Sequence, residues 1–229
     1  MGRQKTLSAQ VGALPKQYDP RATEEQVKKL WEETKTYDLV KKSRSRGTKF
    51  YFLDGPPFPS SDTPHIGTCW NKVLKDTIIR YKRSRGYHVR DQPGYDCHGL
   101  PIELAIEQKL DVKTKKDIES FGLEKFVSEC KRFAEMNSDS MTRVFQDLGV
   151  WMDWARPYMT HHDDYIESDW WGLKQAWSKG LFEHGQRVVH WCPRCETVLS
   201  DYEVVLEYKM LRDPSIYVKF PVEGKQNVR

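Results

Sequence analysis

The sequence predicts an α/β protein: a Rossmann-like parallel sheet comes first, and the start of an inserted module follows it. Three observations predict this. A strand, a turn, a long amphipathic helix and a second strand follow one another between residues 50 and 89. Each of the two strands leads into a loop rich in glycine and proline. After Gly180 the helical periodicity gives way to short strands around a pair of cysteines.

Residues 1–48 are expected to form a helical extension and a linker. Met1–Lys16 carries charges but no apolar run, so it does not look like a signal peptide. Thr23 and Gln26 have the spacing of a capping box. The helix that follows has one apolar face, made of Val27, Leu30 and Trp31. The polar, basic stretch 41–49 then links this extension to the first strand.

Residues 49–180 are expected to form a nucleotide-binding unit. Phe50–Leu53 predicts a strand, Asp54–Pro57 a turn, and the residues after His65 a helix that a left-handed Gly86 can end. Tyr87–Val89 predicts a second strand, which this connection makes parallel to the first. The buried face of the helix is expected to hold Trp70, Val73, Leu74, Thr77, Ile78 and Tyr81, and its solvent side Lys72, Lys75, Arg80, Lys82 and Arg83.

The loops after the two strands are expected to form a ligand site, because open α/β sheets bind ligands at the carboxyl ends of their strands. Backbone N–H groups and the helix dipole at 66–70 suit an anion such as a triphosphate, and His65 can add a donor. Gly67 lets a flat ring approach the backbone, and Asp96 offers a carboxylate to a ligand ammonium. The alternative is purely structural: His65 caps the helix and Asp96 caps the turn before Pro101.

Two further helices complete this unit. One is expected from Phe121 to Leu148, ended by Gly149, and the other from Asp164 to Lys179. The first should bury Phe126, Val127, Cys130, Phe133, Ala134, Met141, Val144 and Phe145. The second repeats Ile166, Trp170, Leu173 and Trp177 in helical register. Cys130 is therefore expected to be a core residue.

Residues 181–229 are expected to begin a new module, with strands at 187–191 and 198–207. Cys192 and Cys195 have the spacing of half a structural zinc site. A redox pair would instead stand at a helix N-terminus after a strand, whereas strand-like sequence lies on both sides here. The histidines close enough in sequence to add a ligand are His184 and His190, and such histidines are more often surface residues.

Composition excludes some classes of protein. The chain of 229 residues is 38% hydrophobic and has no apolar run near the roughly 18 residues of a membrane helix. Five cysteines fit a reducing compartment and a metal site better than disulfides, so a cytoplasmic protein is expected. The formal charge of +4 permits contact with RNA without indicating it.

Several motifs resemble one family, the class I aminoacyl-tRNA synthetases. The four residues from His65 to Thr68, preceded by 54–58, resemble its His-Ile-Gly-His motif, with Thr68 where the second histidine usually stands. Residues 94–103 are more specific, and they resemble the isoleucine enzymes where the valine and leucine enzymes differ. Residues 191–195 and 199–204 extend the resemblance over nearly the whole chain.

The resemblance implies an isoleucine–tRNA ligase of protein biosynthesis that uses ATP with Mg²⁺ to make isoleucyl-adenylate and then charges tRNA-Ile. It implies catalytic roles for His65 and Thr68 and an ATP site of His65, Ile66, Gly67 and Thr68, with adenine over Gly67. Isoleucine would be held by Gly55, Pro56 and Asp96. Zn²⁺ would be bound by Cys192 and Cys195, together with a second cysteine pair from beyond an inserted editing domain.

The resemblance also implies an N-terminal fragment. Residues 213–220 resemble the entry into the editing domain, and the family's lysine-rich signature loop does not occur in these 229 residues. Other interpretations stay open at this point. One is a valine or leucine synthetase, or a small nucleotidyltransferase with the same histidine motif. The other is a non-catalytic zinc or RNA-binding module, which would not bind nucleotide.

Overall fold

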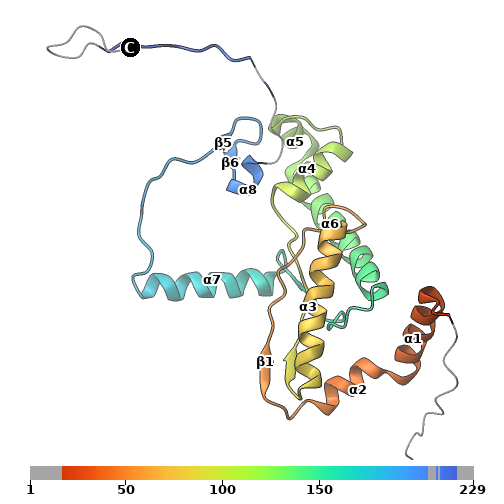
Figure 1. Ribbon diagram of the computed structural model, residues 1–229. Coiled ribbons are helices and arrows are strands. Elements are labelled where there is room, and N and C mark those ends of the chain that lie inside the picture. The colour runs from red at the N-terminus through yellow and green to blue at the C-terminus, as the bar shows by residue number, and fades with distance from the viewer. Residues whose placement is uncertain (1–16, 206–209, 211, 221–229) are drawn as a thin grey trace, which may run out of the picture. The chain divides into compact units, whose positions relative to one another are not determined.

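The computed structural model describes residues 17–205, 210 and 212–220, and the chain divides into two units, residues 1–182 and 183–229 (Figure 1). The first unit holds the two parallel strand pairs and seven of the helices described. No helix in the described ranges is long and apolar enough to cross a membrane.

The chain enters the first unit through two short helices, α1 (Pro20–Thr34) and α2 (Thr36–Ser43). Asp19 is the N-cap of α1, since its side chain accepts a hydrogen bond from the Ala22 N–H at 3.2 Å. The predicted capping box at Thr23 is therefore wrong, because the helix begins one turn earlier. The expected polar linker, residues 41–49, starts inside α2, which ends at Ser43. This helix was not predicted from the sequence.

The predicted crossover is confirmed. Strand β1 (Lys49–Tyr51) and strand β2 (His88–Arg90) are parallel, and α3 (Ile66–Ser84) connects them and lies alongside them (Figure 1). Gly86 has a φ of +92°, as expected for the residue that turns the chain out of the helix. Strand β1 is shorter than predicted and ends before Phe52, whereas β2 has the predicted length and begins one residue later than expected.

A second pair of parallel strands follows β2 in the chain. Strand β3 (Gly94–Tyr95) pairs in parallel with β4 (Tyr158–Met159), and Tyr158 N–H and Thr160 N–H donate to the carbonyls of Pro93 and Tyr95 at 2.9 and 3.2 Å. The segments after β1 and β3 also meet, because Asp96 N–H donates to the Pro57 carbonyl at 3.0 Å. Both predicted loops therefore lie at neighbouring strand ends.

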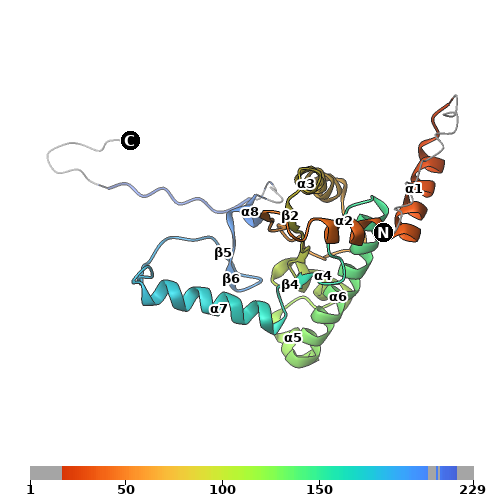
Figure 2. The ribbon, with the colours of Figure 1, turned by 90° about the horizontal axis from the view of Figure 1, so that it is seen from below.

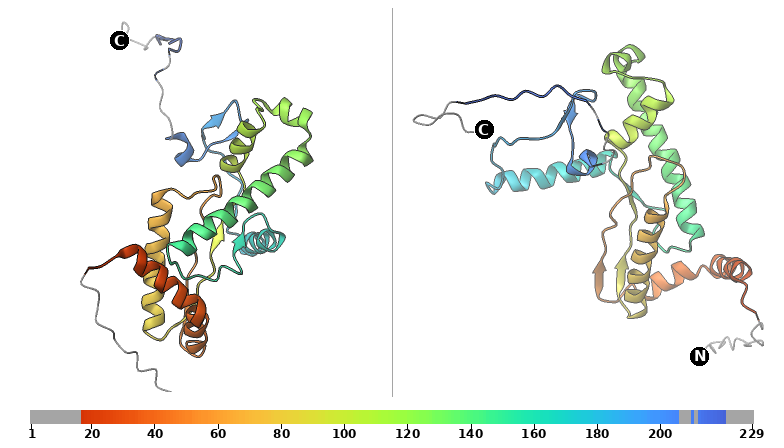
Figure 3. Two further views of the ribbon diagram at one scale, coloured as in Figure 1. Left: turned by 90° about the vertical axis from the view of Figure 1, so that its right-hand side faces the viewer. Right: turned by 45° about the horizontal axis from the view of Figure 1, so that its top comes forward.

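Three helices connect β3 to β4: α4 (Leu100–Lys109), α5 (Lys115–Phe121) and α6 (Leu123–Asp147). Figure 3 shows α4 and α5 at one end of the long α6. Gly122, with a φ of +103°, separates α5 from α6, so the predicted single start at Phe121 is wrong. Helix α6 buries four of the predicted residues, Phe126, Ala134, Met141 and Phe145, and Cys130 packs against the core. Val127 is exposed, against expectation.

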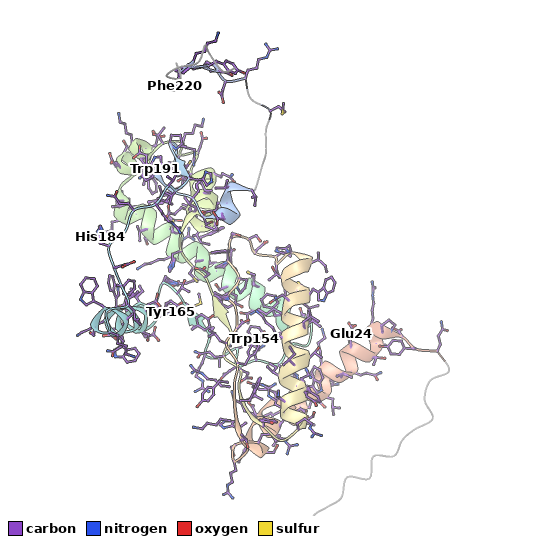
Figure 4. All side chains as sticks on the ribbon, turned by 60° about the vertical axis from the view of Figure 1, so that its left-hand side comes forward. Glu24, Trp154, Tyr165, His184, Trp191 and Phe220 are labelled. Carbon is purple, nitrogen blue, oxygen red and sulfur yellow. The ribbon has the colours of Figure 1, made fainter. Side chains whose placement is uncertain are left out.

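The core lies where α3 and α6 meet the strands. Its buried members include Ile79, Val89, Tyr95, Ile102, Met141, Phe145 and Met152. Trp154 lies between α3 and α6, stacked on the Phe145 ring at 5.9 Å between centroids (Figure 4). Seen from below, α3 is viewed nearly end-on beside β2 (Figure 2).

The orientation of α3 is the reverse of the one predicted. All six residues expected to be buried are exposed, and the buried residues are Lys72, Asp76, Ile79 and Arg83. Each buried charge is paired: Lys72 with Asp54, Asp76 with Arg80, and Arg83 with Asp91. The helix is turned this way because Asp54 and Asp91 follow the ends of β1 and β2 inside the protein. Leaving a buried carboxylate without a cationic partner costs more free energy than leaving an apolar side chain exposed to water.

The predicted last helix of this unit is confirmed as α7 (Asp163–Ser178). None of its residues is buried, and in Figure 4 its side chains project around the helix axis. Trp170, Leu173 and Trp177 share an apolar face with Phe182.

The second unit contains a hairpin and a short helix in its described part. Strands β5 (Trp191–Cys192) and β6 (Thr197–Val198) are antiparallel, and α8 (Asp201–Val204) follows. A strand was expected at 198–207, so this prediction is wrong at 201–204, where a capping box between Ser200 and Glu203 starts a helix. Residues 206 and 207 lie outside the described residues. Residues 213–220, which resemble the entry into the editing domain, have no regular structure.

Candidate active site

The site is built where the segment after β1 meets the start of α3. Asp54 occupies the centre of this junction and has no exposed surface. Its Oδ2 accepts a hydrogen bond from the Gly94 N–H at 3.1 Å, and its backbone carbonyl accepts one from the Tyr158 hydroxyl. Asp54 therefore ties the segments that follow β1 and β2 to β4.

Two lysines of α3 complete the Asp54 cluster. Lys72, which is 1% exposed, pairs with Oδ2, and Lys75 pairs with Oδ1 at 2.8 Å and with the Gly55 carbonyl at 3.0 Å. Burial lowers the pKa of Lys72 below its ordinary value, and the Asp54 carboxylate opposes that shift. Sequence reasoning missed this cluster. Its signal was an aspartate directly after an apolar strand, followed by lysines three residues apart on a helix.

His65 is the N-cap of α3, as the structural alternative had it. Its Nδ1 accepts from the backbone N–H groups of Gly67 and Thr68 at 3.1 and 3.4 Å, and its Nε2 lies 3.0 Å from the Thr68 hydroxyl. Because Nδ1 accepts, the neutral ring carries its proton on Nε2 and donates it to the Thr68 oxygen. The Thr68 hydroxyl proton is then available to a ligand.

Gly67 allows the His65 ring to take this position. A Cβ at residue 67 would lie 2.9 Å from His65 Cε1, closer than real Cβ atoms approach. The ring that lies against Gly67 in this structure is thus the imidazole of His65, where a ligand ring was expected. Two of the N–H groups expected to bind an anion are already occupied by it.

A cleft of about 480 Å³ opens beside the cap. It brings together five predicted residues, Gly55, Pro56, His65, Gly67 and Thr68, and four others, Pro57, Asn71, Lys72 and Lys75. Lys75 and the Thr68 hydroxyl suit an anionic ligand, whereas Lys72 is buried and paired with Asp54. Ile66 does not line the cleft, and its side chain is 84% exposed.

Asp96 lies on the neighbouring segment and does not line that cleft. Its side chain is 28% exposed. Its Oδ1 accepts from the Thr160 hydroxyl at 3.3 Å and lies 3.8 Å from His98 Nε2. The same Thr160 oxygen accepts from the Cys97 N–H at 2.9 Å, which fixes the backbone beside Asp96. Thr160 stands 64 residues away in sequence, and no local pattern pointed to it.

A second cavity, of about 400 Å³, lies beside β1 and β2 and has a structural explanation. It is lined in part by Lys41, Asp91, Asp153 and Arg156. Asp91 is 1% exposed and binds Arg83, Lys41 and the Tyr37 hydroxyl, the last at 2.6 Å. This network anchors α2 to β2.

The predicted cysteine pair lies on a tight hairpin turn. Cys195 N–H donates to Cys192 Sγ at 3.4 Å, and both thiols are partly exposed and free of disulfides. That N–H holds the pKa of the Cys192 thiol below its ordinary value and so favours the thiolate. The short strands β5 and β6 lie on either side of the turn. Within the described part of the chain, neither His184 nor His190 joins the two cysteines in a group of three ligands.

Comparisons with known proteins point to one family. The family model described as class I tRNA synthetases (I, L, M and V) matches residues 26–221. Similar curated proteins include the isoleucine–tRNA ligases of Pyrococcus abyssi, 57% identical over 213 residues, and of Saccharolobus islandicus, 54% identical over 215 residues. These alignments cover 93% and 92% of this chain but 20% of each relative. The chain thus spans about a fifth of their length.

A solved structure is similar as well. It is the ternary complex of Agrobacterium radiobacter K84 agnB2 LeuRS with tRNA and LeuAMS, which matches with a TM-score of 0.57 and 29% identity. The match covers 82% of this chain and 21% of that chain.

Proposed function

The chain belongs to the class I tRNA synthetases, and from this premise we propose that it forms the nucleotide-binding part of an isoleucine–tRNA ligase. One observation carries the proposal: the cleft beside His65 and the carboxylate of Asp96 lie at neighbouring strand ends, in a chain 57% identical to a named isoleucine–tRNA ligase. Within this proposal residues 1–48 are an extension, 49–180 the first half of the catalytic domain, and 181–229 the start of the inserted module.

The proposed reaction has two steps. The carboxylate of isoleucine attacks the α-phosphorus of ATP, which forms isoleucyl-adenylate and releases pyrophosphate. A terminal ribose hydroxyl of tRNA-Ile then attacks the activated carbonyl and displaces AMP. Neither step needs a covalent bond to the protein. The protein contributes position and charge stabilisation, as in phosphoryl transfer generally.

The cleft supplies the phosphate end of this site. Thr68 donates its hydroxyl, which His65 Nε2 orients, and Lys75 supplies positive charge at the rim. Thr68 itself carries no charge, so Lys75, 18% exposed and already in the cleft, is the group that offsets the loss of the usual second histidine. ATP would bring Mg²⁺ to this end. Adenine would lie over the segment of Ile66 and Gly67.

The second loop supplies the amino-acid end. Asp96 pairs with the ammonium of isoleucine, and Thr160 holds the carboxylate that does so. Gly55 and Pro56 line the wall against which the aliphatic side chain lies. We propose isoleucine, and not valine or leucine, as the substrate because relatives about 55% identical to this chain are isoleucine–tRNA ligases.

The hairpin of the second unit supplies half of a zinc site. Cys192 and Cys195 lie on one tight turn, and the Cys195 N–H holds the pKa of the Cys192 thiol below its ordinary value, which favours metal binding. Two more ligands are needed, so zinc would be held jointly with another part of the protein. Five free cysteines also favour a reducing, cytoplasmic location.

The experiment is amino-acid-dependent exchange of pyrophosphate into ATP, measured for isoleucine, valine and leucine. In the full-length enzyme we expect exchange with isoleucine, and a drop of about 10²–10³ on Lys75→Met, the usual effect of removing one electrostatic donor. The 229 residues alone, which hold the first half of the catalytic domain, are expected to show little or no exchange. Lys174→Met, on an exposed helix, is the matched control. Zinc or RNA binding without any nucleotide binding would favour the non-catalytic module instead.

A further inference from the structure

A group of metal-binding side chains lies outside the proposed active site. Glu135 comes from the middle of α6, and His161 and His162 come from the turn between β4 and α7. Each offers one ligand atom, and these three atoms all lie within 4.8 Å of one another. Among the described residues this is the one such group of histidine, cysteine and carboxylate side chains.

The His161 ring is what separates this group from an ordinary surface cluster. Its side chain is only 9% exposed, and it points toward Glu135 with Nε2 3.4 Å from Oε1. Its Nδ1 is buried and has no hydrogen-bond partner. Buried polar atoms in proteins are almost always satisfied, so an unpaired imidazole nitrogen indicates a partner that the described residues do not supply.

His162 is available for the same role. It is the N-cap residue of α7, yet its side chain makes no capping hydrogen bond. Its ring instead lies against that of His161, with centroids 4.6 Å apart. His162 and Glu135 are exposed, so rotation of these two side chains can close the group around an ion while His161 stays fixed.

We propose that Glu135, His161 and His162 bind a divalent transition metal, with Zn²⁺ as the best chemical fit. Two imidazoles and one carboxylate are a ligand set that zinc accepts, and they leave a fourth position for water or another ligand. Calcium and magnesium prefer an all-oxygen shell, so two nitrogens disfavour them. This site shares no residue with the cysteine hairpin or with the cleft beside His65.

The group of Glu135, His161 and His162 lies next to the segment that holds Asp96. An ion held by α6 and by the start of α7 would fix the residues that directly follow β4. Thr160 is the first of these, and its hydroxyl holds Asp96. The metal would thus act as a clamp on the segment that orients Asp96.

The test is zinc titration by calorimetry of the apo protein carrying Cys192→Ser and Cys195→Ser, so that the hairpin cannot contribute. We expect one saturable equivalent of Zn²⁺ and a rise in melting temperature on its addition. His161→Ala and His162→Ala should each weaken binding by at least about tenfold. His184→Ala, a histidine outside the cluster, is the matched control and should leave binding unchanged.

Because His161 is buried, its variant can fail to fold, and the exposed His162 then decides the result. No saturable zinc binding in the serine background would overturn the proposal. So would binding that His162→Ala and Glu135→Gln leave at full strength. Cobalt titration of the same variants gives a second readout, since a nitrogen and oxygen site shows ligand-field absorption without the thiolate charge-transfer band of a cysteine site.

Discussion

Replacing Lys72 by methionine should reveal how much the buried cluster at Asp54 stabilises the fold. The substitution keeps the length of the side chain and removes its charge. Lys72 and Asp54 are 1% and 0% exposed, so the carboxylate would lose its most buried cation without gaining water. Breaking a buried ion pair from one side costs about 3–5 kcal/mol.

The remaining contacts place the expected cost at the lower end of that range. Asp54 keeps Lys75 at 2.8 Å and the Gly94 N–H at 3.1 Å, which still compensate part of its charge. The Lys72 ammonium also lies 5.2–6.0 Å from the ring centroids of Tyr95, Phe145 and Trp154, and the methionine sulfur can replace these cation–π contacts by sulfur–aromatic ones. We expect Lys72→Met to lower the free energy of unfolding by about 3 kcal/mol.

Urea denaturation at 25 °C, followed by circular dichroism, measures this change. Lys75→Met is the matched control on the same helix: its side chain is 18% exposed, so its loss should cost clearly less than that of Lys72. A loss below 1 kcal/mol for Lys72→Met, or equal losses for both variants, would refute the view that the buried pair determines how α3 is turned.

Three further predictions follow from single contacts. Gly94→Ala should lower the free energy of unfolding in urea by at least about 3 kcal/mol, because the new Cβ would lie 2.0 Å from the Tyr158 ring. Adding Tyr158→Ala should recover part of this loss. An unaltered stability of the single variant would contradict the close packing. In the full-length enzyme, Asp96→Asn should weaken isoleucine binding by about 1.5–3 kcal/mol in calorimetry and leave ATP binding nearly unchanged, because only the charge-assisted contact is lost. An equal loss for ATP would mean that Asp96 only supports its turn. Burial tends to raise the pKa of Asp153, but hydrogen bonds from Lys41 and Arg156 outweigh it and hold the pKa below the ordinary 3.8. Asp153 therefore stabilises the fold above that pH and loses this effect as the pH falls through its folded-state pKa, so Asp153→Asn should be more destabilising at pH 7 than at pH 3. A pH-independent loss would argue against that charge effect.

The sequence by itself determined the elements that depend on local pattern. The crossover of β1, α3 and β2, the long α6 and the turn of the cysteine pair follow from apolar spacing, glycine positions and the short interval between two cysteines. The candidate residues at His65, Gly67 and Thr68 also came together as expected, because a helix N-terminus brings neighbours in sequence into one place. These features need only short-range geometry, which the sequence encodes directly.

Only the tertiary structure decided which face of α3 is buried. Periodicity shows that a helix has an apolar and a charged face, but it does not show what lies opposite each one. Here Asp54 and Asp91 are buried beside the helix, and pairing them with Lys72 and Arg83 turns the charged face inward. The contact of Thr160 with Asp96 and the meeting of Glu135 with His161 join residues 64 and 26 positions apart. Such contacts depend on how the strands and helices assemble. Burying a charge without a partner costs free energy, and this cost selects among the possible assemblies. Local sequence pattern does not contain that information.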